Sequence, residues 1–378
     1  MLYISKKVSL SEEKSVAMFE SLTVELGARS YPVLLGDTAE WLPELHKYIA
    51  NRKVLVISDE NICRAGHLQK LLGELKKFDD VSAVDYVLAP GEEYKTLASV
   101  ENICRAAVNA GLDRSSVFIA LSGGVAGDLT GFAAAIYMRG VDFIQLPTTL
   151  LAAVDSSVGG KTGADLPEGK NLVGAFHQPR LVAMDMNVLD TLPESQWRNG
   201  LAEIVKYGMI MDKEFFALLE NNVEKLNSFD KEFYCRIIRR SCACKAEVVA
   251  SDECEKGRRA ILNYGHTAGH AVEKLSNFTL PHGMAVAIGM AAAARLAVLM
   301  KLCPAEVEMT QNRLLKKLSL PVNLPEHSDI EAIISAMHSD KKNSKNGITM
   351  VLPTAVGSVE IVRGIDEKLL CTALGDIL

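Results

Sequence analysis

The sequence changes its hydrophobic periodicity once, near Leu192. Before this point five short β-rich runs alternate with helical stretches, and they lie at 54–59, 81–89, 116–123, 143–147 and 181–185. Such alternation predicts an α/β domain with a mainly parallel sheet. The run VFIAL at 117–121 is continuously apolar, as in a strand covered on both faces. We therefore expect this strand at the centre of the sheet.

After Leu192 long helical patterns replace the strand signals, at 194–227, 230–250, 264–276, 283–302 and 304–318. Pro193 stands where the first turn of a helix tolerates proline, with Thr191 or Leu192 near the cap. A chain of 378 residues also exceeds the usual size of a single core. We predict an α/β domain over 1–192 and a mainly α-helical domain over 193–378. Residues 1–20 are polar and are expected to form a loosely attached extension.

Charge and composition exclude several classes of partner. The 47 acidic and 41 basic side chains leave a net charge of -6, which argues against nucleic acid as a partner. The most hydrophobic segment, 284–300, contains Arg295 and falls short of the roughly 20 apolar residues of a bilayer span, so we expect a buried helix and no membrane partner. Eight scattered cysteines and an N-terminus without an apolar stretch predict a reduced, cytoplasmic protein.

Two loops at predicted strand ends suit a nucleotide. SGGVAGD at 122–128 lies between a strand and a helix, where glycines let a phosphate approach free backbone N–H groups. It is not a true G-x-G-x-x-G motif, and a turn shaped for packing is the alternative. PGEEYKT at 90–96 adds Glu92 and Lys95 for ribose hydroxyls and phosphate, with a solvated loop as the alternative. Two such loops at one sheet edge favour nucleotide binding.

A second group of residues is cationic and lies among glycines. It consists of Arg139, Lys161, Lys170 and Asn171, and five glycines fall between 159 and 174. The glycines suggest loops shaped around a ligand, and the cations suit a phosphate or carboxylate. Ordinary surface charge is the alternative reading.

A third group predicts a metal site. His266 and His270 stand four residues apart in NYGHTAGH, on one helical face, and His282 opens the next helix. Glu203, on an otherwise apolar helix with Lys206 one turn beyond, is the best carboxylate to complete three ligands and leave one position open. HTAGH lacks the glutamate of a zincin motif. A core of hydrogen-bonded histidines is the alternative.

Seven motifs spread over residues 20–360 resemble those of the 3-dehydroquinate synthases, within the sugar phosphate cyclase family. They are PGEEYKTL, SGGVAGDLTGFAAAIYMRG, FIQLPTTLLAAVDSSVGGKTG, GKNLVGAFHQP, LPESQWRNGLAEIVKYG, RAILNYGHTAGHAVE and PHGMAVAIGM. The resemblance implies a Rossmann-like N-terminal domain that binds NAD and a helical C-terminal domain that holds zinc or cobalt. The active site would lie in the cleft between them.

The resemblance also implies roles for individual residues. The implied metal ligands are Glu203, His266 and His282. Arg139 is similar to an arginine that reaches a neighbouring subunit's site, which implies a homodimer. The implied cofactor contacts are Asp59, Asn61, Glu92, Lys95, Gly123, Gly124, Val125, Asp128, Thr148, Thr149, Lys161 and Lys170. The implied substrate and catalytic residues are Asp155, Lys161, Asn171, Lys206, Lys245, Arg259, Asn263, His270, Lys341 and Lys342.

The reaction implied by the resemblance turns 3-deoxy-D-arabino-heptulosonate 7-phosphate into 3-dehydroquinate and phosphate, in the shikimate pathway. NAD oxidises the C5 hydroxyl, phosphate is eliminated, the ketone is reduced again and an intramolecular aldol step closes the ring. Lys245 and Arg259 suit the substrate carboxylate, and Lys161 and Asn171 suit its phosphate. The alternatives are another sugar phosphate cyclase, a metal-dependent polyol dehydrogenase and a catalytically silent NAD-binding regulator.

Overall fold

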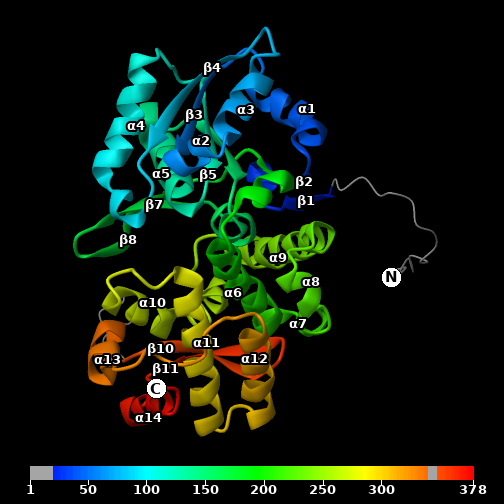
Figure 1. Ribbon diagram of the computed structural model, residues 1–378. Helices are drawn as coiled ribbons and strands as arrows, with labels where there is room; N and C mark the ends of the chain where they lie inside the picture. Colours follow the sequence, from blue (N-terminus) through cyan, green and yellow to red (C-terminus); the bar gives the residue numbers. More distant parts are fainter. Residues whose placement is uncertain (1–19, 339–346) are drawn as a thin grey trace, which may run out of the picture.

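The computed structural model describes residues 20–338 and 347–378. A sheet with helices on both faces forms one part of the molecule, and a mainly helical part lies beneath it (Figure 1). The fold class expected from the periodicity is confirmed. The seven strands of the sheet are β1 (Glu20–Val24), β2 (Tyr31–Gly36), β3 (Lys53–Asp59), β4 (Ser82–Leu88), β5 (Val117–Ser122), β6 (Asp142–Pro147) and β9 (Val182–Asp185).

The strand order is β1-β2-β9-β6-β5-β3-β4, and all neighbours are parallel except the antiparallel pair β1–β2. The five predicted runs correspond to β3, β4, β5, β6 and β9. All six residues of β5 are buried, with β6 on one side and β3 on the other. The continuous apolar run is therefore a central strand, as expected.

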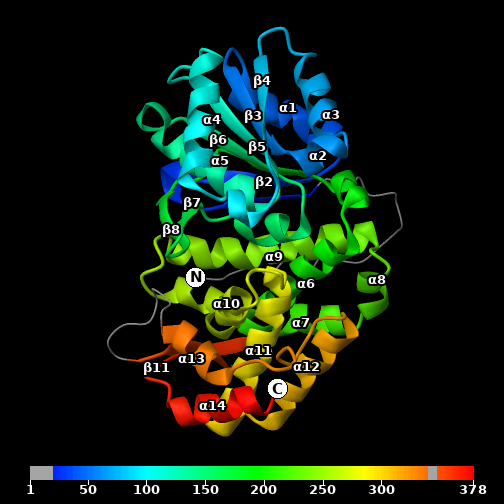
Figure 2. The same ribbon diagram turned by 60° about the vertical axis from the view of Figure 1, so that its left-hand side comes forward.

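Alternate residues of the central strands face two separate layers of helices. Ile119 packs with Trp41 of α1 and Leu71 of α3 on one face, whereas Phe118 packs with Ile103 of α4 and Leu129 of α5 on the other. The view in Figure 2 shows α1 and α3 on one side of the sheet and α4 and α5 on the other. These helices, with the short α2, are α1 (Thr38–Ile49), α2 (Glu60–Arg64), α3 (His67–Leu75), α4 (Leu97–Asn109) and α5 (Gly124–Ile136).

The glycine-rich segment at 159–174 is not only loop, which corrects the sequence interpretation. It contains a two-stranded antiparallel hairpin of β7 (Lys161–Leu166) and β8 (Gly169–Phe176). A Cβ on Gly174 would lie 2.1 Å from the carbonyl oxygen of Thr162, so close contact between the two strands requires a glycine there. At least part of this glycine content therefore serves strand packing rather than a ligand.

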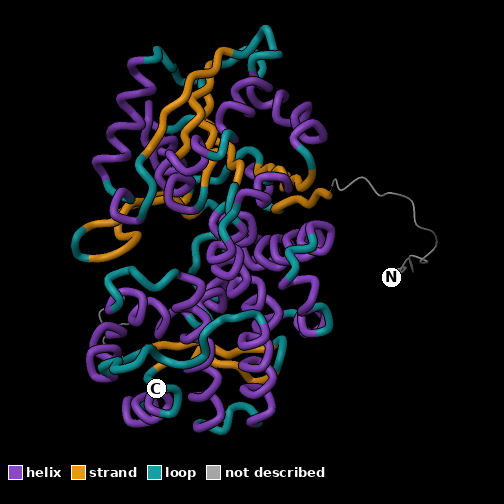
Figure 3. The backbone as a smooth tube through the Cα atoms, in the orientation of Figure 1, coloured by secondary structure: helices purple, strands orange, loops and turns teal. Residues whose placement is uncertain are grey.

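In its described residues the C-terminal half is helical with one small hairpin, the orange pair β10 and β11 in the lower part of Figure 3, which the sequence did not predict. The predicted helix at 194–227 is divided into three helices. The first break falls at Asp212, which accepts a hydrogen bond from the backbone N–H of Phe215 and caps the second helix. Pro193 is itself the cap of α6. The elements are α6 (Glu194–Met211), α7 (Lys213–Glu220), α8 (Val223–Asn227), α9 (Lys231–Ser251), α10 (His266–Leu275), α11 (His282–Leu299), α12 (Ala305–Lys317), α13 (Ile330–His338), β10 (Thr349–Ala355), β11 (Ser358–Arg363) and α14 (Glu367–Gly375).

Helix α11 is the apolar segment that we expected to be buried. By length and composition it could cross a membrane, but 72% of it is buried inside the protein, so it is a core helix. It packs closely on α10: a Cβ on Gly289 would lie 1.8 Å from the carbonyl oxygen of Gly265. Gly265 itself has a φ of 78°, a left-handed conformation that favours glycine. This contact brings the start of α10 close to α11.

Candidate active site

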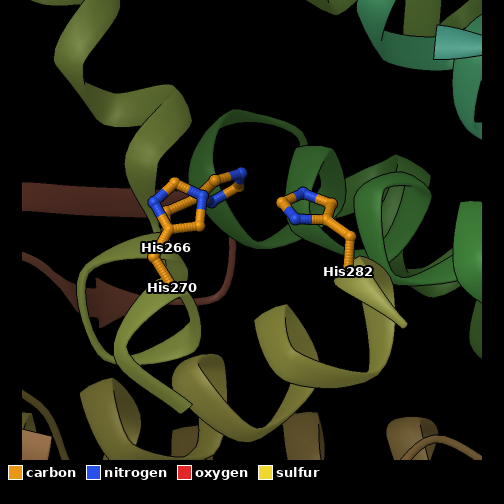
Figure 4. Close-up of side chains that lie close together, drawn as sticks. All are labelled: His266, His270 and His282. Carbon is orange, nitrogen blue, oxygen red and sulfur yellow. The ribbon is translucent and has the colours of Figure 1, made fainter. Parts of the chain in front are cut away.

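Three histidines converge from α10 and α11. His266 is the first residue of α10, His270 follows one turn later, and His282 is the first residue of α11. Their ligand nitrogens all lie within 4.8 Å of one another, and the three rings gather in the space between the two helices (Figure 4). Glu203 of α6 completes the group, because its Oε1 lies 3.4 Å from His266 Nε2 and 3.8 Å from His282 Nε2.

Two of these rings are oriented by acceptors on their far side. His266 Nδ1 lies 3.0 Å from the carbonyl oxygen of Tyr264, and His282 Nδ1 lies 3.4 Å from Oε2 of Glu273. An acceptor at Nδ1 favours the proton on that nitrogen and leaves the lone pair on Nε2, which is the nitrogen that faces Glu203. Burial opposes the charged form of His282, but Glu273 and other carboxylates raise its pKa above the ordinary value.

Glu203 and Lys206 form an ion pair inside the protein, with side-chain exposures of 0% and 1%. Beyond this contact, neither oxygen of Glu203 accepts a well-formed hydrogen bond from the part of the chain that the structure describes. A buried carboxylate with unsatisfied oxygens beside imidazole nitrogens is a suitable donor set for zinc or cobalt. The residues present therefore fit a divalent metal.

The two halves meet at a network of buried charges next to this group. Lys245 of α9 donates to Oδ1 of Asp155 at 2.7 Å, and the hydroxyl of Tyr207 donates to the same atom at 3.0 Å. Asp155 lies in the short π-helix η4 (Ala152–Ser156). Burial by itself would raise the pKa of Asp155, but Lys245 and Lys206 hold it well below the usual range. Asp155 therefore holds Lys245 in place and lies in the electrostatic field of Lys206.

Glu255 connects other residues that the sequence singled out. Its carboxylate pairs with Lys161 of β7 and accepts a hydrogen bond from Asn263 Nδ2 at 3.0 Å. Arg259 is 1% exposed and donates to the carbonyl oxygen of Gly159 at 3.0 Å, while its Nε has no partner among the described residues. Two segments about 100 residues apart thus place these polar groups at one interface.

The predicted nucleotide residues share the carboxyl edge of the sheet. Asp59 ends β3, Gly123 separates β5 from α5, and Thr148 follows β6. These three strands are neighbours, so the residues meet at one edge. Thr148 Oγ1 is buried without a partner among the described residues, and the backbone N–H groups that open α5 face the same edge. These groups fit a nucleotide phosphate.

Lys95 is not part of a solvated loop. It is 5% exposed and lies 2.6 Å from Oδ2 of Asp128 and 2.7 Å from Oδ1 of Asn171. Although burial opposes its charge, Asp128 and Glu92 raise the pKa of Lys95 overall. The lysine therefore joins the loop after β4, helix α5 and the β7–β8 hairpin.

Comparison with known proteins identifies the family. A model described as the N-terminal part of 3-dehydroquinate synthase matches residues 85–199, and one for its C-terminal part matches 200–343. The 3-dehydroquinate synthase of Picosynechococcus sp. is 44% identical over 362 residues, with 94% of this chain and 98% of the relative covered. That of Nostoc punctiforme is 46% identical over 353 residues, with 91% and 96% covered.

The chain belongs to the 3-dehydroquinate synthase family.

Solved structures of related cyclases share the whole fold. A 2-deoxy-scyllo-inosose synthase complexed with carbaglucose-6-phosphate, NAD⁺ and Co²⁺ has a TM-score of 0.87 at 28% identity, covering 95% of this chain and all of its own. A 2-epi-5-epi-valiolone synthase from Streptomyces hygroscopicus with NAD⁺ and Zn²⁺ bound has a TM-score of 0.82 at 26% identity, covering 98% and 99%. An NADH-dependent butanol dehydrogenase from Thermotoga maritima, at 16% identity and a TM-score of 0.64, shows a related fold alone.

Some residues of the family motifs lie apart from this network. Arg139 ends the turn η3 (Tyr137–Arg139), is exposed, and makes no hydrogen bond or ion pair with the rest of the described chain. Met138 and Arg139 both have a positive φ, 47° and 69°. Lys341 and Lys342 lie outside the described residues.

Sequence reasoning missed three residues of the network. Glu255, Glu273 and Tyr207 were not among the candidates, although Glu273 is 5% exposed and contacts both Lys170 and His282. Tyr207 and Glu273 each lie within a motif that carries the family resemblance, so their position in these motifs was the available signal.

Proposed function

We propose that the interface between the two halves carries out the 3-dehydroquinate synthase reaction, the conversion of 3-deoxy-D-arabino-heptulosonate 7-phosphate to 3-dehydroquinate and phosphate. The convergence of Glu203 with three histidines, next to the buried cations Lys206 and Lys245, carries this proposal. Family membership at over 40% identity across most of the chain supports it.

Glu203, His266 and His282 would hold the metal, because their donor atoms face one another and two acceptors set the histidine tautomers. A bound zinc or cobalt ion supplies Lewis acidity that lowers the pKa of a substrate hydroxyl and polarises the ketone. The related cyclases with bound Co²⁺ or Zn²⁺ support this choice of metal.

NAD would bind along the carboxyl edge of the sheet. Asp59, Gly123, Gly124 and Thr148 line this edge, and Asn61, Val125 and Thr149 stand beside them in sequence. Bound NAD supplies a hydride acceptor for the C5 alcohol and later a hydride donor for the ketone. The solved cyclases with NAD⁺ support this assignment.

The cations at the interface would bind the two anionic ends of the substrate. Lys245 and Arg259 hold the carboxylate, and Arg259 is already oriented by its bond to the Gly159 carbonyl. Lys161 and Asn171 hold the phosphate. Since Glu255 now pairs with Lys161, an incoming phosphate must replace that carboxylate. Cations at both ends of one site select a substrate that carries a negative charge at each end.

Proton movement would fall to His270 and Lys206. His270 lies beside both histidine ligands, and Lys206 is paired with Glu203 and close to Asp155. Lys206 would balance the negative charge that develops on the substrate alkoxide. His270 would hold a proton near the oxygens of the substrate ring. The phosphate of the substrate can itself accept the C6 proton, so no further protein base is needed.

The remaining assignments concern assembly and location. We place the domain boundary at 192/193, beside Pro193, while the two family models meet at 199/200. Exposed Arg139 has the position of a residue that would act on a partner's site in a homodimer. All eight cysteines are free, which suits a reduced cytoplasmic protein.

One incubation tests the reaction. Purified protein is mixed with NAD⁺, Zn²⁺ or Co²⁺ and the heptulosonate phosphate, and released phosphate and the carbocyclic product are measured together with absorbance of NADH. We expect one phosphate per carbocycle and no lasting NADH. Accumulation of NADH in step with substrate loss would instead support the polyol dehydrogenase alternative, and product from a neutral-ended sugar phosphate would support another cyclase.

A further inference from the structure

Glu273, near the end of α10, is one carboxylate shared by the two halves of the molecule. It is 5% exposed. Its Oε1 lies 3.1 Å from Lys170 Nζ on β8, and its Oε2 lies 3.4 Å from His282 Nδ1 at the start of α11. The two oxygens therefore have separate partners, one from the sheet-bearing half and one from the group of histidines.

The contact with His282 decides which ring nitrogen is available to a metal. With the Nδ1 proton donated to Glu273, the lone pair resides on Nε2, which faces Glu203 at 3.8 Å. A carboxylate in this position also increases the basicity of the imidazole, because it stabilises positive charge on the ring. His266 Nδ1 faces the neutral carbonyl oxygen of Tyr264 instead, whereas His282 Nδ1 faces a carboxylate.

The contact with Lys170 connects this carboxylate to the edge of the sheet. Lys170 Nζ also lies 3.1 Å from Oε1 of Glu92, in the loop after β4, and 4.3 Å from the centre of the Phe278 ring. The ammonium group of Lys170 is therefore shared between Glu92 of the sheet-bearing half and Glu273 of the helical half. A ligand that draws Lys170 toward Glu92 would leave Glu273 with one cation fewer and strengthen its bond to His282.

We propose that Glu273 is a positioning residue that orients His282 for metal binding and ties it to Lys170, so that occupancy of the cofactor edge changes the affinity for the metal. This inference rests on the proposed function, since it takes His282 as a ligand. By thermodynamic reciprocity, metal would change the affinity for NAD⁺ by the same factor.

The first experiment measures metal affinity without turnover. Metal-free wild-type protein, Glu273→Gln and the control Lys274→Met, an exposed neighbour on the same helix, compete with a chromophoric chelator for Zn²⁺. Glutamine keeps the size of the side chain but removes its charge. We expect Zn²⁺ affinity to fall about 10- to 100-fold in Glu273→Gln and to stay unchanged in Lys274→Met. The visible spectrum of bound Co²⁺ should also change in Glu273→Gln.

The second experiment measures the coupling. Zn²⁺ affinity is determined with and without saturating NAD⁺, for wild type and for Lys170→Met, which keeps the length of the side chain and the Glu273–His282 contact. We expect the two affinities to differ in wild type and to be equal in Lys170→Met, at an NAD⁺ concentration that a separate titration shows to saturate each protein. Thermal unfolding and circular dichroism establish that each variant is folded. If Glu273→Gln does not fold, Glu273→Asp, which keeps the charge but shortens the side chain, replaces it with the same expected loss of Zn²⁺ affinity, and Lys170→Met still tests the coupling.

The outcomes separate this inference from the proposed function. Zn²⁺ affinity at the wild-type level in folded Glu273→Gln overturns the positioning role, and an unchanged NAD⁺ effect in Lys170→Met overturns the coupling. Full metal binding by His282→Ala would instead overturn the ligand assignment on which the proposed function depends.

Discussion

Lys245 Nζ lies 2.7 Å from Asp155 Oδ1, although 90 positions separate the two residues in the chain. The bond joins α9 of the helical half to the π-helix η4, which lies between β6 and β7 in the chain. Burial lowers the pKa of Lys245, and the neighbouring carboxylate partly offsets this effect. The pair therefore fixes the place of the Lys245 ammonium group at the interface.

This fixed cation predicts selectivity for an acidic substrate. The heptulosonate phosphate should be turned over with a kcat/KM roughly 100-fold or more above that of glucose 6-phosphate or sedoheptulose 7-phosphate, because a substrate without a carboxylate leaves Lys245 and Arg259 buried and unmatched. Arg259→Ala should reduce this ratio, chiefly by lowering kcat/KM for the acidic substrate. The measurement is kcat/KM for the three sugars, and an equal value for either neutral-ended sugar would contradict the assignment.

Loss of a metal ligand should remove metal and activity together. Glu203→Gln, His266→Ala and His282→Ala are each expected to lose bound Zn²⁺ after gel filtration, as measured by atomic absorption. His270→Ala should retain the metal and lose turnover, since we assign this residue to the substrate and its protons. If His270→Ala lost its metal while Glu203→Gln kept it, the three histidines would be the ligands.

Shared sites in a homodimer should show complementation. Arg139→Ala and Lys161→Ala are each expected to be inactive, and a mixture of the two should regain activity because one site of a hybrid dimer contains both wild-type groups. Subunit exchange is established separately with tagged chains. Exchange without any recovery of activity would exclude a role of Arg139 in the partner's site.

Asp185 should stabilise the sheet-bearing half in a pH-dependent way. This carboxyl is 5% exposed and accepts hydrogen bonds from Thr38 Oγ1 at 2.6 Å and Lys70 Nζ at 2.9 Å. Burial by itself raises its pKa, but these bonds lower the pKa below the ordinary value. Asp185→Asn should therefore reduce the free energy of unfolding by about 1 to 3 kcal/mol at pH 7.

The sign of the pH effect follows from the lowered pKa. Because the folded pKa lies below the unfolded value of about 3.9, the stabilisation is complete above about pH 5 and is lost as the pH falls through the folded pKa. Urea unfolding of wild type and Asp185→Asn between pH 3 and 7 should show a constant difference that shrinks below about pH 4. Asp79→Asn, at an exposed carboxylate, is the control. A difference that grows toward low pH would contradict the assignment.

Much of the fold could be predicted because periodicity reports burial locally. The apolar run at 117–121 has no polar residue to face water, so it had to be covered on both faces. The four-residue spacing of His266 and His270 placed both on one helical face for the same local reason. Glu203 stood out as an acid on an otherwise apolar helix, and the motif resemblance added substrate contacts such as Lys245 and Arg259. These features depend only on residues near one another in sequence or on family motifs.

The tertiary structure alone decided which charges pair. Glu255 with Lys161, Glu273 with Lys170, and Asp155 with Lys245 join residues roughly 100 positions apart, and the pairs exist because packing brings α9, α10 and the β7–β8 hairpin to one interface. Backbone contacts such as Gly289 against Gly265 set the distance between α10 and α11, the helices that begin with His266 and His282. No local pattern encodes such long-range contacts, because each depends on how complete elements pack.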